Sequence, residues 1–278
     1  MQKQYSKLSK LIILIIVTAL FSCSVEKRIA KEFIKTRSTV NILVYNNNIL
    51  SKSNIKINAI QNYDSLSTEA KDSVWMANTV FLNNIKDSVF INNYYVYFVN
   101  KLKVLGFKVF TSDSLQQFMS ASGDKFIISL IQNEIEEYYD YQRIDYDITE
   151  TTEPIFKEFW LNALNFNTWL EINKANSIEP LKIIVYSSLK TSDGLDAKFT
   201  YQPFTDEINF VQNYYPVTIG DVMSLSVEEG KRNAYYLFDY LMNLYIKDNL
   251  GQKPNYYYHY NGSIYNLEHT NDKFAKIE

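Results

Sequence analysis

The chain has 278 residues and a mass of 32.6 kDa, and its 46% hydrophobic and 21% charged residues exclude disorder and a collagen-like structure. Its seven glycines never lie closer than ten residues apart, so neither a G-x-G-x-x-G motif nor a P-loop can be written. One cysteine and two histidines exclude an internal disulfide and a multi-thiolate zinc site. The composition therefore predicts no cofactor and no nucleotide ligand.

The first 22 residues have the pattern of a signal peptide. Lys3, Lys7 and Lys10 stand before an apolar run, and no acidic residue accompanies them. The run covers residues 11–21, whereas a membrane-spanning helix needs about 20 apolar residues. We therefore predict a signal peptide over residues 1–22, with a transmembrane helix as the weaker alternative.

The chain's only cysteine follows this run. Residues 20–23 (LFSC) place an aliphatic residue three positions before Cys23 and a small residue directly before it. This arrangement resembles the lipobox of bacterial lipoproteins. The resemblance implies that the Cys23 thiol carries a diacylglycerol, that signal peptidase cleaves before Cys23, and that the new amino group is acylated. Each buried methylene contributes about 0.8 kcal/mol, so two or three such chains anchor a domain to a membrane. A buried, inert cysteine after a plain secretory signal is the alternative.

The residues after Cys23 carry the sorting information of such lipoproteins. Ser24 stands where aspartate tends to retain Gram-negative lipoproteins in the inner membrane, so the resemblance implies the outer membrane. Lipoproteins exported to the cell surface often have an acidic cluster at this point, but here Glu26 is followed by a base, Lys27. We expect an outer-membrane lipoprotein whose body faces the periplasm.

Charge is distributed unevenly along the mature chain. The precursor carries −3, and loss of the three signal-peptide lysines leaves −6. Residues 24–38 carry +3, so residues 39–278 carry −9. We expect residues 23–38 to form a lipidated basic tether beside an anionic membrane surface, with a solvated linker as the alternative, and residues 39–278 to form one globular domain. The acidic body would repel phosphates, so a nucleic-acid partner is not expected.

The first predicted elements are two helical stretches around a strand. Apolar residues recur every four positions from Val25 to Phe33, which predicts a short amphipathic helix near the membrane interface. Residues 40–45 (VNILVY) predict a first core strand. Residues 68–105 have apolar side chains at helical spacing and predict one long helix or two stacked helices, with the weakest point at residues 87–93.

The middle of the chain is predicted to be rich in strands, with one short helix that ends by Gly123 after the first of them. Alternation of apolar and polar residues indicates strands with one solvated face. The predicted strands cover residues 107–110, 126–131, 143–148, 160–172 and 181–187, with weaker candidates at 199–204 and 207–215.

The C-terminal helix is the most clearly marked element. Ser226 and Glu229 form a capping box that would open it, and Gly251 would end it. The Asn-Gly pair at 261–262 lies between two tyrosine-containing stretches and predicts a hairpin in a C-terminal tail that begins at about residue 252.

This order of elements predicts a single domain of the α/β or α+β class. We expect a mixed β-sheet with a long helical hairpin near the N-terminus and a long C-terminal helix packed on it. In element order alone, the chain resembles periplasmic accessory lipoproteins such as the curli secretion lipoprotein, activators of penicillin-binding proteins and auxiliary lipoproteins of lipid transporters. No residue motif accompanies this similarity, so it implies no functional residue.

An acid-rich stretch between residues 134 and 153 is the best candidate for a site. Residues two apart on a strand share a face and lie about 6.6 Å apart, so Glu134 and Glu136 meet the carboxylate separation of a glycosidase. Asp145 and Asp147 form a second pair of this kind. Exposed strands of an acidic protein also carry such pairs without catalysis. Calcium binding is a comparable possibility, although the order of an EF-hand loop is missing.

The histidines and tyrosines give weaker signals. His259 and His269 lie in the tyrosine-rich tail, where a histidine is more often packed or solvated than catalytic, so we predict neither a catalytic histidine nor a metal site. The 23 tyrosines, several of them in runs, suit glycan stacking or protein interfaces. Packing in half-buried strands and on helix flanks is the more frequent role of such residues.

Four Asp-Ser-aliphatic sequences resemble the acceptor motif for O-glycosylation of exported proteins in some bacteria. Asp-Ser also starts helices, and this is the alternative. The serines concerned are Ser65, Ser73, Ser88 and Ser114.

These observations predict a non-enzymatic, lipid-anchored protein of the bacterial envelope that acts as an adaptor or accessory of a membrane-associated complex, with an envelope protein as its partner. One alternative is a lipoprotein that binds a glycan or a small ligand through its tyrosines. A second is a carboxylate-dependent hydrolase that uses the acid-rich stretch. A pocket lined by tyrosines and convergent polar groups would favour the binding alternative.

Overall fold

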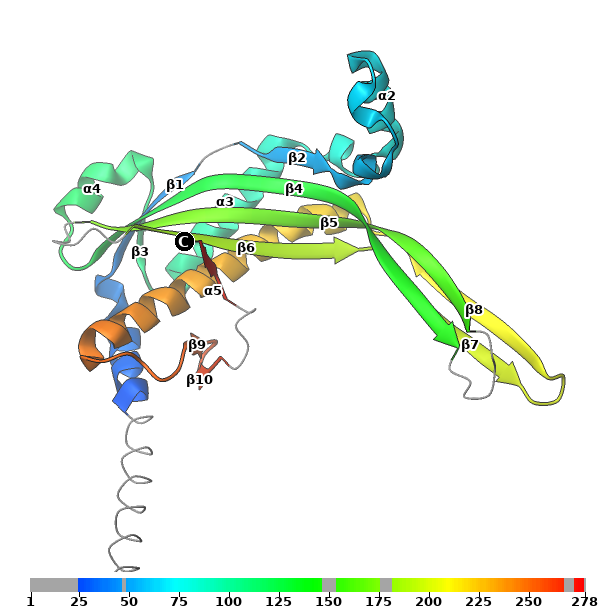
Figure 1. Ribbon diagram of the computed structural model, residues 1–278. Helices are drawn as coiled ribbons and strands as arrows, with labels where there is room; N and C mark the ends of the chain where they lie inside the picture. The colour runs from blue at the N-terminus through cyan, green and yellow to red at the C-terminus, as the bar shows by residue number, and fades with distance from the viewer. Residues whose placement is uncertain (1–24, 47–48, 147–153, 176–181, 268–272, 278) are drawn as a thin grey trace, which may run out of the picture.

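A twisted β-sheet, two long helices on one of its faces and a projecting β-arm make up the fold (Figure 1). The predicted mixed sheet with a long C-terminal helix is confirmed. The structure is a computed structural model, and it describes residues 25–46, 49–146, 154–175, 182–267 and 273–277.

The main sheet has the strand order β11-β6-β5-β4-β1-β3, and β2 pairs with the middle of β4. Strands β3, β1 and β4 are parallel, as are β2 and β4, while β5 pairs antiparallel with β4 and β6, and β6 pairs antiparallel with β11. The strands are β1 Asn41–Asn46, β2 Ser51–Asn54, β3 Lys108–Phe110, β4 Lys125–Tyr146, β5 Ile155–Lys174, β6 Lys182–Ser192 and β11 Ala275–Ile277. Two further hairpins are formed by β7 Gly194–Gln202 with β8 Glu207–Tyr215, and by β9 Tyr258–Tyr260 with β10 Ile264–Asn266.

The alternation predicted for the central strands is confirmed in β5. Leu164, Phe166 and Leu170 are fully buried on the helix-covered face, while Asn165 and Glu171 lie on the opposite, more open face. Strand β1 lies between β3 and β4, and its first four residues are all buried. A strand with both faces covered reads as a continuous apolar run, which explains the VNILVY sequence.

The helical region after residue 68 consists of two helices, as one of the two predicted alternatives had it, but the break lies at residues 79–86 and not at the predicted residues 87–93, which begin the second helix. Phe81 and Ile85 are buried, as their spacing predicts, but they lie in the segment between α2 and α3 instead of continuing the helix. Helix α3 packs against α5, whereas no residue of α2 is buried. The helices are α2 Thr68–Asn78, α3 Asp87–Val104, α4 Leu115–Ser120 and α5 Ile219–Leu250, with short 3-10 turns η1 Arg37–Thr39, η2 Ile55–Ala59, η3 Tyr63–Ser65, η4 Leu82–Asn84 and η5 Ser112–Ser114. In the part of the chain that the structure describes, no helix is long and apolar enough to cross a membrane.

Close packing of α3 on α5 depends on Gly230. A Cβ atom at this position would lie 2.4 Å from the carbonyl oxygen of Tyr94 and 3.1 Å from the backbone nitrogen of Phe98. Only a residue without a side chain lets the two backbones approach this closely.

Helix α5 begins seven residues before the predicted capping box. Its N-cap is Thr218, whose side chain accepts from the backbone N–H of Asp221 while the Asp221 carboxylate accepts from the N–H of Thr218. Ser226 and Glu229 are buried inside the helix, so the prediction that they open it is wrong. Two Ser/Thr-x-x-acid patterns occur in succession, and the earlier one, Thr218 with Asp221, caps the helix. The predicted end is confirmed, because Gly251 is the C-cap in the left-handed conformation.

Residues 25–36 are helical, but their apolar stripe does not face a membrane interface. Ile29, Ala30 and Phe33 are buried in the core, and the ring of Phe33 packs edge-on to Phe238 at 5.5 Å. The prediction of a separate tether over residues 23–38 is therefore wrong for the residues described. The apolar stripe gains more by burial against α5 than by partial immersion in headgroups. Cys23 and the predicted signal peptide lie outside the described residues.

Candidate functional site

The carboxylates predicted as a site are not brought together. Glu134 and Glu136 lie on the open face of β4, where Glu136 accepts hydrogen bonds from the amides of Asn165 and Asn167 at 3.1 and 2.7 Å. Asp145 lies nine residues further along the same strand, about 30 Å from Glu136 at 3.3 Å per residue. There it pairs with the exposed Arg143 at 2.7 Å. Asp147, the fourth candidate, lies outside the described residues.

No group of three or more His, Cys, Asp or Glu side chains in the described ranges is placed to hold a metal ion. Of the serines in Asp-Ser-aliphatic sequences, Ser73 lies within α2 and donates to the carbonyl of Glu69, while Ser114 forms a capping box with Thr111. The role of Ser114 matches the helix-start explanation, whereas Ser73 lies in the interior of its helix, and glycosylation stays a prediction.

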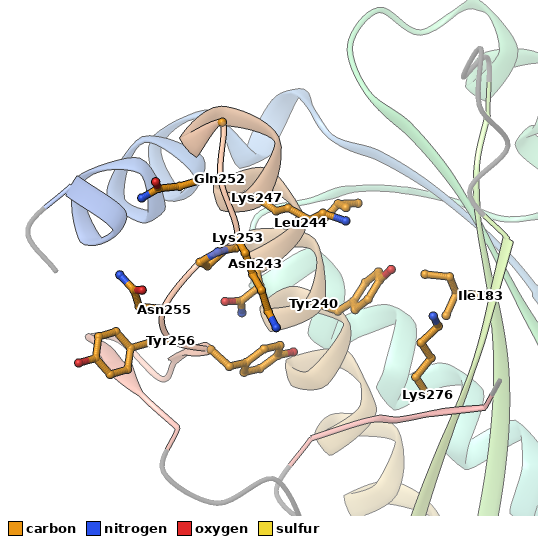
Figure 2. Close-up of a pocket in the computed structure, with 13 residues that line it drawn as sticks. Ile183, Tyr240, Asn243, Leu244, Lys247, Gln252, Lys253, Asn255, Tyr256 and Lys276 are labelled. Carbon is orange, nitrogen blue, oxygen red and sulfur yellow. The ribbon is translucent and has the colours of Figure 1, made fainter. Parts of the chain in front are cut away.

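A cavity of about 860 Å³ lies where the C-terminal half of α5, the segment after it and the sheet edge meet (Figure 2). Tyr240, Leu244 and Lys247 face it from one side of α5, because residues three and four apart share a helix face. Tyr240 extends from the helix toward Ile183 of β6 and Lys276 of β11 in Figure 2. The site is therefore assembled from three parts of the sequence.

An asparagine of α5, Asn243, holds the segment after α5 against the helix. Gly251 ends the helix with a positive φ of 70° and turns the chain back along α5. The Asn243 side chain accepts from the N–H of Tyr258 at 2.8 Å and donates to its carbonyl at 2.7 Å. Because both backbone groups of Tyr258 are satisfied by one side chain, the cavity wall has a defined position.

The helix of residues 25–36 supports the same segment. The buried carboxylate of Glu26 accepts from the backbone N–H of Asn255 and from the hydroxyl of Tyr258, each at 2.8 Å. Figure 2 shows this helix beside Gln252 and Asn255. The first described turn of the chain is thus part of the cavity's support.

The side chains that line the cavity are basic, aromatic or neutral. Lys247, Lys253 and Lys276 line it, and among the residues that the structure describes no acidic side chain does. Within the described residues, none of these three lysines forms an ion pair. Burial, and then the nearby Asp248, raises the pKa of Tyr240 to about 12. Burial also raises the pKa of Tyr257, so both phenols stay neutral and do not offset the lysine charge.

An Asp–His pair lies behind the cavity. The buried Asp239 carboxylate contacts Nδ1 of His259 and accepts from the N–H of Tyr260 at 3.0 Å. Burial raises the pKa of Asp239, while the contact with His259 opposes this shift. The pair fixes the β9–β10 hairpin to α5, because Asp239 lies on α5 and both of its partners lie in β9.

The tyrosine runs divide between the two roles expected from the sequence. Tyr94 and Tyr258 are fully buried and pack inward. Tyr256 is 48% exposed at the rim of the cavity, with Tyr257 beside it in the wall. One run therefore lines a pocket with convergent polar groups, the feature that favours the binding alternative.

A second candidate site is the arm, which we define as residues 138–146, 155–162 and 194–215. The arm extends beyond the region where β6 covers β5 (Figure 1). Its two ribbons pack through aromatic rings, with Phe159 and Phe210 stacked at 5.8 Å and Tyr146 and Phe199 at 5.5 Å. Eleven large apolar side chains remain exposed on its outside: Tyr139, Tyr141, Ile155, Phe156, Trp160, Tyr201, Phe204, Ile208, Val211, Tyr214 and Tyr215.

A polar network joins the arm to the body. Asp193, at the corner between β6 and β7, accepts from the Tyr214 hydroxyl, from both nitrogens of Asn162 and from the N–H of Val217. Burial alone would raise the pKa of Asp193, but the bonds from Tyr214, Val217 and Asn162 outweigh it and lower the pKa. The side chain of Asn162 also accepts from the buried Lys56 at 2.8 Å.

Lys56 itself forms a fully buried ion pair with Glu137 at 2.6 Å. The Glu137 carboxylate also accepts from three successive backbone N–H groups, of residues 80, 81 and 82. The pair thus fixes η2 and the start of η4 to β4 at the base of the arm.

Sequence reasoning missed the cavity and the arm. The cavity lysines come from different segments of the chain, and only Lys247 and Lys253, as two bases near the predicted end of a helix, could have been noticed from the sequence. Trp160 shares the parity of the buried residues of β5 but is 64% exposed, because the helices do not extend beneath the arm. The sequence did not show that β4 and β5 extend further than the helices that cover the sheet.

Comparisons with known proteins add no relative to this picture. The chain matches no protein-family model, and a search of the curated proteins finds no match.

Proposed function

We propose that the protein is a lipid-anchored component of the bacterial envelope, held at Cys23, that uses its arm to bind an envelope protein as an adaptor or accessory of a membrane-associated complex. The observation that carries the proposal is the arm, with its eleven exposed large apolar side chains. Tyr139, Tyr141, Phe156 and Trp160 lie on one face of the β4–β5 ribbon, where the rings of Tyr141 and Trp160 pack at 5.0 Å. An exposed apolar cluster of this kind marks interaction sites on soluble domains.

Composition favours a protein partner over a lipid surface for the arm. Tyrosine and tryptophan are the residues most enriched among binding hot spots. The described arm carries six acidic and three basic residues, so an anionic membrane would repel it. The network around Asp193 and Lys56 holds the arm in one orientation, which lowers the entropic cost of binding.

Anchoring is tested by metabolic labelling with a fatty-acid analogue. The wild type is expected to incorporate the label and Cys23→Ala to lose it. Equal labelling of both proteins would refute the anchor.

The role of the arm is tested by co-purification after mild crosslinking in the native envelope. A triple variant, Trp160→Ser, Phe204→Ser and Tyr215→Ser, is expected to lose a partner that the wild type retains. The matched control replaces Met76, Val104 and Met119 by serine, because these side chains are 59 to 75% exposed and lie outside the arm. Equal recovery by both variants would refute the role of the arm.

A second candidate function is ligand binding in the cavity beside α5. Its tyrosine walls and convergent lysines favour it, and the envelope location applies to it equally. A hydrolase that uses Glu134 or Glu136 has no such support, because the side-chain amides of Asn165 and Asn167 donate hydrogen bonds to the Glu136 carboxylate.

A further inference from the structure

The cavity beside α5 lies close to the predicted anchor. Cys23 and Glu26 are three positions apart in the sequence, and three residue steps span at most about 11 Å when fully extended. Glu26 is buried and hydrogen-bonded to Asn255 and Tyr258, so no long tether separates it from the cavity wall. If Cys23 is lipidated, the cavity is held beside the lipid headgroups.

The charge of the cavity suits an anion. Lys247, Lys253 and Lys276 line it, and Lys273 lies 4.3 Å over the ring of Tyr257 in its wall. The C-terminal carbonyls of α5 contribute only about half a negative charge, and the carboxylates of Asp248, Glu26 and Asp239 contribute at most one each. Four ammonium groups exceed this total of about 3.5 negative charges.

The shape of the cavity suits a ligand that also has an apolar part. Its volume of about 860 Å³ lies within the range of small-molecule sites, roughly 300–1,000 Å³. Ile183, Tyr240 and Leu244 form an apolar wall, and the half-exposed Tyr256 stands at the rim. Apolar wall and ammonium groups face the same space, as an amphipathic ligand requires.

We propose that this cavity binds the phosphate-containing headgroup of an anionic membrane phospholipid. The lysines contact the phosphate, and the wall formed by Ile183, Tyr240 and Leu244 contacts the glycerol and the first acyl methylenes. The proposal rests on the anchor at Cys23, because the anchor supplies the lipid surface at this end of the molecule. Phosphate is common to lipids and soluble phosphates, and the apolar wall favours the lipid.

Native mass spectrometry of the full chain, purified from the envelope in a mild non-ionic detergent, tests the proposal. Phosphatidylglycerol is added, and bound lipid is counted on each protein. The wild type is expected to retain one phosphatidylglycerol, and the triple variant Lys247→Gln, Lys253→Gln and Lys276→Gln at least tenfold less. The control variant Lys86→Gln, Lys103→Gln and Lys108→Gln changes the charge equally at exposed positions outside the cavity and is expected to bind like the wild type.

Two measurements on the wild type need no variant. Phosphatidylcholine is expected not to replace phosphatidylglycerol, and inorganic phosphate is expected not to displace it at equal concentration. Equal retention by the two triple variants, or equal binding of phosphatidylcholine, would overturn the proposal, and displacement by inorganic phosphate would show that the ligand is a soluble phosphate. The same spectra report the mass added at Cys23, so failure of the anchor is seen separately from failure of lipid binding.

Discussion

Replacement of Lys56 by methionine tests the account of the base of the arm. The substitution keeps most of the side-chain volume but removes the ammonium group that lies 2.6 Å from Glu137 and 2.8 Å from Asn162. Loss of one partner of a buried ion pair costs about 3–5 kcal/mol, because the other charge is left buried without compensation. Three backbone N–H groups still donate to Glu137, so we expect a cost near 3 kcal/mol, at the lower end of this range.

The assay is urea-induced unfolding, and the matched control is Lys52→Met. Lys52 pairs with Asp87 at the same distance of 2.6 Å, but the two side chains are 24% and 49% exposed. A surface pair contributes at most about 1 kcal/mol, so the control is expected to lose far less stability. If Lys56→Met costs no more free energy of unfolding than Lys52→Met, the buried network does not stabilise the arm as described.

Two further predictions concern helix packing and pH. Gly230→Ala is expected to lower stability by about 1–3 kcal/mol, because α3 and α5 must separate to make room for the added methyl group. Gly220→Ala lies in the same helix with its nearest neighbour at 3.4 Å, so it is expected to raise stability by up to about 1 kcal/mol. Thermal unfolding measures both variants, and equal effects would refute the close approach of the two helices. The lowered pKa of Asp193 stabilises the fold above the ordinary aspartate pKa of about 3.9, and this contribution is lost as pH falls through the folded-state value. The difference in unfolding free energy between wild type and Asp193→Asn is therefore expected to shrink from about pH 6 to about pH 3, and a constant difference would contradict the role of the ionised carboxylate.

Local patterns predicted the elements of this fold well, and long-range geometry less well. The apolar run of β1, the alternation in β5 and the hairpin at Asn261 and Gly262 follow from neighbouring residues, and all three are present. The helical stripe from Val25 to Phe33 was also correct as a pattern. Its burial partner could not be read, because an amphipathic helix looks the same facing a membrane or a protein core.

The candidate sites depended even more on contacts between distant residues. Glu26 supports Asn255 across 229 positions of sequence, and no local pattern indicates such a contact. The acid-rich stretch looked like a site because acids two apart share a strand face, but Asp145 continues onto the arm while Glu136 stays on the body. The spacing of two carboxylates along one strand does not indicate whether both of them line a common cleft.

The most direct test of the proposed function is photo-crosslinking in the native envelope from a photoreactive amino acid at position 204. Phe204 is fully exposed in the turn between β7 and β8, so the probe replaces no packed side chain. The account predicts one discrete crosslinked protein, obtained again from position 160 but not from Met76, which lies on α2. No adduct from the arm, or the same adducts from position 76, would contradict the claim that the arm binds an envelope protein.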